Sequence, residues 1–128
     1  MSGENFNHYV NALSDQETPK FKDEVVTLYL STDSIYRLKK IKKFTEMKNN
    51  IIINMAITFF FNSSSAYRDH YSFDAEGRSV AYIATLKNEQ RVAKQAEEKG
   101  LVITSMFSII ATIGINILYE KLLGKKGE

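Results

Sequence analysis

The side chains best suited to acid-base chemistry near neutral pH are two histidines, His8 and His70. Asp69, His70 and Tyr71 are adjacent, which could suggest an acid-base pair or a nucleophilic tyrosine, but neighbours in a connecting segment need not face one another. Neither histidine lies in an H-x-x-x-H pattern. The chain has no cysteine, which excludes thiolate zinc sites and cysteine nucleophiles. We therefore expect a protein that is not an enzyme and that uses no metal or cofactor.

The basic residues are concentrated in one part of the chain, which favours a polyanionic partner. Residues 20–62 contain eight basic and four acidic side chains, whereas residues 1–19 contain three acidic side chains and no Lys or Arg. Lys39, Lys40, Lys42 and Lys43 form the densest run. Such a run is typical of a solvated helix face as well as of a nucleic-acid contact.

The basic part also contains the clearest structural signals. Val26, Leu28 and Leu30 alternate with polar or smaller residues, which predicts a strand over about 24–31 with one buried face. Asp33 or Ser34 is expected to cap a helix over about 33–46. A second, more apolar helix is expected over about 48–62.

A fainter copy of this pattern returns 54 positions later, with a strand over about 79–85 and helices over about 87–99 and 102–119. The polar stripe of the last helix in each copy shows the repeat best. The two stripes are Asn50, Asn54, Thr58 and Asn62, and Thr104, Ser108, Thr112 and Asn116. Each stripe follows one helix face because its members are four residues apart.

The repeat suggests the architecture. One strand followed by two helices cannot close a core, so two such units are expected to pair antiparallel through their strands. The expected fold class is mainly α with a short two-stranded antiparallel β-ribbon. The expected organisation is a flexible N-terminal arm (1–19), unit 1 (20–62), a connector (63–78), unit 2 (79–123) and a tail (124–128).

Three stretches carry a resemblance to a known family: VVTLYLSTDSIYRLKKI, MKNNIIINMAI and, more weakly, SVAYIATLKNEQRVAKQAEEKGLVITSMFSII. They resemble the ribbon-helix-helix DNA-binding family, here as a tandem duplication in one chain. The resemblance covers about 80 of the 128 residues and is mostly a hydrophobic rhythm. It implies double-stranded DNA as the partner, with the ribbon inserted in the major groove.

The resemblance also implies the contact residues. The expected base-reading positions are the outward residues of the two strands, namely Val25, Thr27, Tyr29 and Ser31, and Ser79, Ala81, Ile83 and Thr85. The family anchors a phosphate at the N-terminus of each second helix, which corresponds here to Lys48, Asn49, Asn50, Thr104 and Ser105. The family usually places Arg, Lys, Asn or Gln on the ribbon face. The apolar and hydroxyl-bearing face of this chain could favour A·T-rich sites, or unit 2 could serve assembly alone.

The role implied by the family is that of a plasmid or mobile-element accessory factor, bound at an origin of transfer beside a relaxase or another plasmid protein, or an autoregulating transcriptional repressor. The expected location is cytoplasmic, without membrane attachment. Three alternatives stay open: an assembly protein in which unit 2 oligomerises, a membrane-attached protein using residues 101–119, and a homo-oligomer in which like units pair between chains.

Overall fold

The computed structural model describes residues 25–62 and 77–124. In this part the chain forms β1 (Val26–Ser31), α2 (Thr32–Thr45) and α3 (Asn49–Asn62), and then β2 (Gly77–Tyr82), α5 (Leu86–Lys99) and α6 (Ile103–Tyr119). One π-helical turn, η1 (Glu120–Gly124), extends α6. The expected class, mainly helical with a two-stranded antiparallel sheet, is confirmed. The expected arm at 1–19 and most of the connector and tail lie outside the described residues.

The two strands pair antiparallel within one chain, and we call this pair the ribbon. Its register places Thr27 opposite Ala81, with Val26 opposite Tyr82 and Leu28 opposite Val80. Thr27 and Ala81 are separated by 54 positions, the same spacing as the sequence repeat. The second strand begins two residues earlier than expected and ends at Tyr82 instead of residue 85. Ile83 and Thr85 therefore follow the strand and are not part of it.

The helix ends repeat with the same spacing. Ser31 and Thr85 are the N-caps of α2 and α5, and each accepts a bond from the amide three residues on, at 3.2 Å in both cases. The expectation that Asp33 or Ser34 caps α2 is wrong, because the Ser31 hydroxyl already occupies that position. The helices end at residues 54 positions apart, Glu46 and Gly100, both in the left-handed conformation with φ of 60° and 69°.

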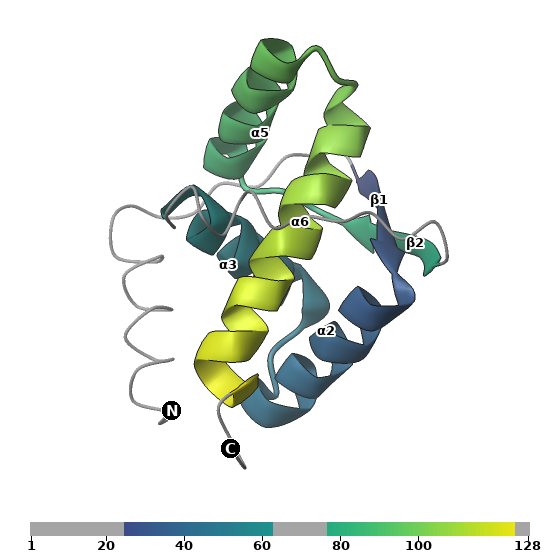
Figure 1. The fold of residues 1–128 in the computed structure, drawn as a ribbon, viewed down its shortest axis with the longest axis vertical. Helices are drawn as coiled ribbons and strands as arrows, with labels where there is room; N and C mark the ends of the chain where they lie inside the picture. Colours follow the sequence, from purple (N-terminus) through teal and green to yellow (C-terminus); the bar gives the residue numbers. More distant parts are fainter. Residues whose placement is uncertain (1–24, 63–76, 125–128) are drawn as a thin grey trace.

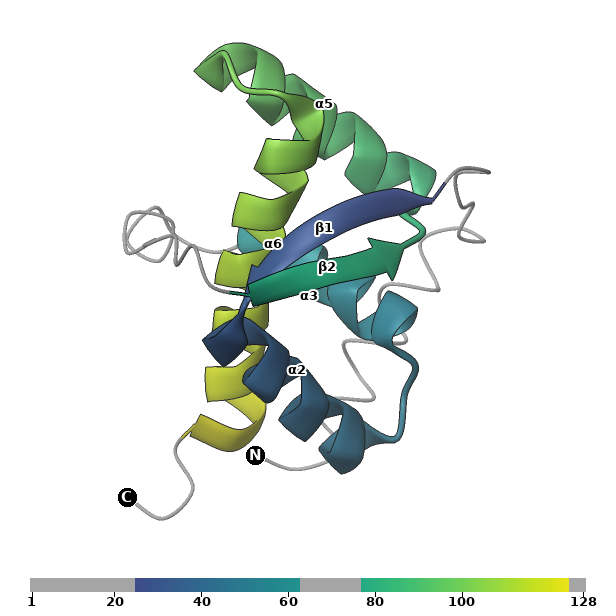
Figure 2. The same cartoon turned by 90° about the vertical axis from the view of Figure 1, so that its right-hand side faces the viewer.

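The core is centred on α6, which packs against α3, β1, α2 and α5. Figure 2 shows the ribbon lying across α3 and α6, with α2 and α5 leaving from its opposite ends. The inward residues Leu28 and Leu30 are fully buried beneath the ribbon. At the crossing of α3 and α6 a side chain on Gly114 would overlap the backbone carbonyl of Ala56, so the two helices meet at backbone distance.

The segment Ile103–Gly124, which combines α6 and η1, is long and apolar enough to cross a bilayer by composition alone. However, 67% of its most apolar window is buried inside the molecule, as in the core helix of a soluble protein. Its polar residues Ser108 and Thr112 are also buried, and their hydroxyls donate to carbonyl oxygens one turn earlier. This helix thus forms the centre of the fold (Figure 1).

Candidate nucleic-acid interface

One face of the ribbon is turned away from the helices and is largely exposed. Thr27 and Ala81 lie at its centre and are both exposed, as is Ser79, while Tyr29 is half-buried. Val25 and Ile83, just beyond the paired residues, are 59% and 37% exposed. Six of the eight residues expected to face outward are therefore on an accessible surface.

Two of the eight are not on this surface. Ser31 and Thr85 were expected to face outward, which is wrong, because they are only 7% and 8% exposed. Their hydroxyls cap α2 and α5, and the Ser31 hydroxyl also donates to the Ser34 hydroxyl at 3.1 Å. The alternating pattern ends where the chain enters the helix. Ser31 and Thr85 stand at these points, and their side chains bond to the first turn of the helix instead of facing outward.

The ribbon face meets the start of α6 in an open hollow of about 470 Å³. The lining combines residues of both strands with the first turns of α6, namely Thr27, Leu28, Tyr29, Ser79, Thr104, Ser105, Ser108 and Ile109. The buried Ser108 hydroxyl accepts the Tyr29 backbone amide at 2.8 Å, which fixes β1 to α6 at this place. Three expected base-reading residues and two expected phosphate-binding residues thus line one site.

The start of α3 holds the other end of the ribbon. The Asn50 side-chain oxygen accepts the Ile83 backbone amide at 2.5 Å, and the Asn54 side-chain nitrogen donates to the Ile83 carbonyl oxygen at 3.0 Å. Ile83 and Tyr29 are 54 positions apart, so α3 and α6 fix equivalent points of the two units. The N-termini of both helices consequently lie beside the exposed face, where unpaired amides and the helix dipole attract anions.

A buried polar network supports the α3 end. The Asn54 side chain is 2% exposed, and its oxygen accepts bonds from the Tyr82 hydroxyl, the Thr85 amide at 3.0 Å and the Asn88 amide group at 3.2 Å. The Asn88 amide group also donates to the Asn54 backbone carbonyl at 3.0 Å. Burial raises the pKa of the Tyr82 phenol well above its usual range, so this tyrosine stays protonated and acts as a donor.

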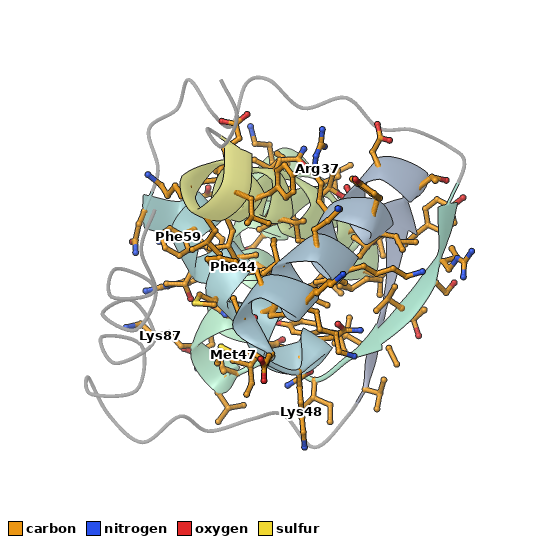
Figure 3. All side chains as sticks on the ribbon, turned by 90° about the horizontal axis from the view of Figure 1, so that it is seen from below. Arg37, Phe44, Met47, Lys48, Phe59 and Lys87 are labelled. Atoms are coloured by element: carbon orange, nitrogen blue, oxygen red, sulfur yellow. The ribbon has the colours of Figure 1, made fainter. Side chains whose placement is uncertain are left out.

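Among the basic side chains of α2 and of the segment before α3, Arg37 differs from four of the lysines. Arg37 is engaged in the fold, since it donates to the Asn116 side chain at 2.8 Å and lies over the Tyr119 ring. By contrast Lys39, Lys42, Lys43 and Lys48 are exposed, and among the described residues no carboxylate pairs with them. Lys48 points away from the body of the protein just before α3 (Figure 3).

The sequence did not predict that Asn54 and Ser108 bond to the backbone at the ribbon, or that Ile51 is exposed beside it. The polar stripes that contain Asn54 and Ser108 are visible in the sequence as a repeat, but the pattern alone did not indicate that they hold the strands. Ile51, in the first turn of α3, is 36% exposed beside Asn50. Within the described residues no cluster of three or more His, Asp or Glu could hold a metal ion.

No protein-family model, no curated protein and no solved structure matches this chain.

Proposed function

We propose that this chain is a tandem ribbon-helix-helix protein that binds double-stranded DNA through the exposed face of the ribbon. The observation that carries the proposal is the position of this face between the N-termini of α3 and α6. Asn50 of α3 accepts the amide of Ile83 just after β2, and Ser108 of α6 accepts the amide of Tyr29 in β1. A two-stranded ribbon fits the major groove of B-form DNA. Helix N-termini beside it suit the phosphates that border the groove.

The repeat of 54 residues supports the tandem interpretation. The N-caps, the helix starts and the left-handed helix ends all recur at this spacing, and the paired residues Thr27 and Ala81 are themselves 54 positions apart. One chain would then supply both halves of a reading unit. A second chain is then not needed to complete the ribbon, because β1 pairs with β2 of the same chain. A homo-oligomer would form through surfaces other than the ribbon.

The lysines give the charge that such binding requires. Lys39, Lys42, Lys43 and Lys48 are exposed on α2 and just before α3. Each phosphate that these cations neutralise releases a counterion, so affinity should fall steeply as salt rises. In a cell the proposed roles are those of a cytoplasmic accessory factor at a plasmid origin of transfer, beside a relaxase, or of an autoregulating repressor.

A fluorescence anisotropy titration tests the proposal, with labelled A·T-rich and G·C-rich duplexes at several salt concentrations. The double variant Thr27→Ala with Tyr29→Ala should bind both duplexes alike, because base readout is lost while phosphate contacts stay. Gln90→Ala, an exposed change on α5, should bind like the parent. No salt-dependent binding by the parent protein would reject the proposal and favour the assembly role.

A further inference from the structure

The two ends of the exposed ribbon face differ in chemistry, although they occupy equivalent positions of the repeat. Val25, Ile51 and Ile83 gather beside the start of α3, and we call them the apolar end. The equivalent residues of the other unit are Ser79 for Val25, Ser105 for Ile51 and Tyr29 for Ile83. All three line the hollow beside α6. We call these three residues the hydroxyl end.

The two ends of the ribbon face also differ in the charge of the residue that precedes the neighbouring helix. Lys48 precedes α3 beside the apolar end, and its counterpart before α6 is Val102, which is 68% exposed. Three lysines of α2 are also not repeated, because Lys39, Lys42 and Lys43 correspond to Ala93, Ala96 and Glu97, whereas Lys40 corresponds to Lys94. Among the described residues, the net charge is therefore more positive in the unit that contains α2 and α3.

Each chemistry suits a different feature of a DNA groove. Exposed aliphatic side chains pack against the methyl group that thymine places in the major groove, whereas hydroxyl groups donate to and accept from base edges and phosphates. A twofold-symmetric site would present the same edges to both ends. Since β1 and β2 belong to one chain and differ in sequence, one half of such a site would meet the wrong side chains.

We infer that the protein binds a non-palindromic duplex site in a single orientation, with thymine methyl groups under the apolar end and the hydroxyl end over the other half. This inference rests on the proposed DNA binding and adds the polarity of the site. Lys48, beside the apolar end, strengthens phosphate contacts on the thymine-rich side.

Selection from a pool of duplexes with a random central 24 base pairs gives the first test. An enriched non-palindromic sequence with thymines clustered in one half is expected. A palindrome or an inverted repeat would overturn the inference and leave DNA binding intact. No enrichment of any sequence would reject sequence-preferring binding itself, so the two failures are distinguishable.

Replacement of thymine by deoxyuridine in the enriched duplex gives the sharper test, because it removes only the methyl group. Each replacement in the thymine-rich half should weaken binding about fourfold, as expected for loss of one buried methyl contact, while replacements in the other half should have no effect. Ile83→Ser should reduce this sensitivity. Leu101→Ser, an equally exposed aliphatic residue in the turn before α6, should retain it.

Equal sensitivity in both halves, or sensitivity unchanged by Ile83→Ser, would overturn the inference. The Ile83 substitution is suitable because only the backbone of this residue is bonded to Asn50 and Asn54. Circular dichroism of the variant checks that its fold is retained.

Discussion

Gly114 lies against the backbone carbonyl of Ala56 where α6 crosses α3, and a side chain at residue 114 would overlap that carbonyl. The counterpart of Gly114 in the first unit is Phe60, and the counterpart of Ala56 in the second is Ile110. Pairing of two first units between chains would therefore place Phe60 where the backbones approach most closely. The crossing favours pairing of the two different units within one chain.

The first prediction concerns this crossing. Gly114→Val should destabilise the protein by about 3 kcal/mol, because the helices must move apart and the core beneath the ribbon must repack. Thr104→Ala, an exposed change on the same helix, should alter stability by less than about 0.5 kcal/mol. Urea unfolding followed by circular dichroism measures both. An unaltered midpoint for the valine variant would contradict the close crossing.

Substitutions at the two left-handed helix ends, Glu46 and Gly100, are predicted to change the free energy of unfolding in opposite directions. Glu46 adopts φ of 60°, which costs a side-chain-bearing residue about 1 kcal/mol relative to Gly. Glu46→Gly should therefore raise the free energy of unfolding, and Gly100→Ala, at φ of 69° in open space, should lower it by a similar amount. Thermal unfolding of the two variants checks the signs. Changes of the same sign would contradict the equivalence of the two turns.

Asn54 is predicted to be the most sensitive polar residue. Asn54→Leu leaves the Tyr82 hydroxyl and the Thr85 amide without their acceptor in a buried site, and it removes the side-chain donor to the Ile83 carbonyl. Each unsatisfied buried group costs about 1–3 kcal/mol, so the loss should exceed about 3 kcal/mol. Ser108→Ala, at the equivalent position, removes one acceptor, that of the Tyr29 amide, and should cost about 1 kcal/mol. Equal losses would contradict the hub role of Asn54.

We predict that the buried Tyr82 makes the free energy of unfolding fall at alkaline pH. Burial raises the pKa of the folded phenol above its ordinary value of 10.0, so the unfolded chain loses this proton first. The contribution of Tyr82 is fully present below pH 10.0 and falls by about 1.4 kcal/mol per pH unit above it. Unfolding free energies from pH 8 to 11 measure the slope. Tyr82→Phe should show a shallower slope, and an identical slope would contradict the assignment.

The sequence predicted the elements well because their signals are local. Apolar alternation placed β1, and helical spacing placed α2, α3, α5 and α6 within two residues. The ends of the strands were less predictable. Ser31 and Thr85 continue the alternation, but capping competes for their hydroxyls, and only the turn of the backbone decides the outcome.

The candidate site was predictable only in part, since it depends on contacts between distant residues. Thr27, Tyr29 and Ser79 were identified from strand alternation with the family resemblance, and Thr104 and Ser105 from the start of a helix. Their meeting in one hollow follows from the pairing of β1 with β2 and from the bond between Ser108 and Tyr29. The repeat predicted the pairing of the strands, but the bond between Ser108 and Tyr29 has no signal in the sequence of either segment.

The most direct measurement is the change in backbone amide NMR shifts when an A·T-rich duplex is added to the folded chain. We expect the largest changes at Thr27, Tyr29 and Ala81 on the ribbon and at Asn50 and Thr104 in the first turns of α3 and α6. Changes confined to the outer face of α5, or no changes at low salt, would contradict the claim that the exposed ribbon face binds DNA.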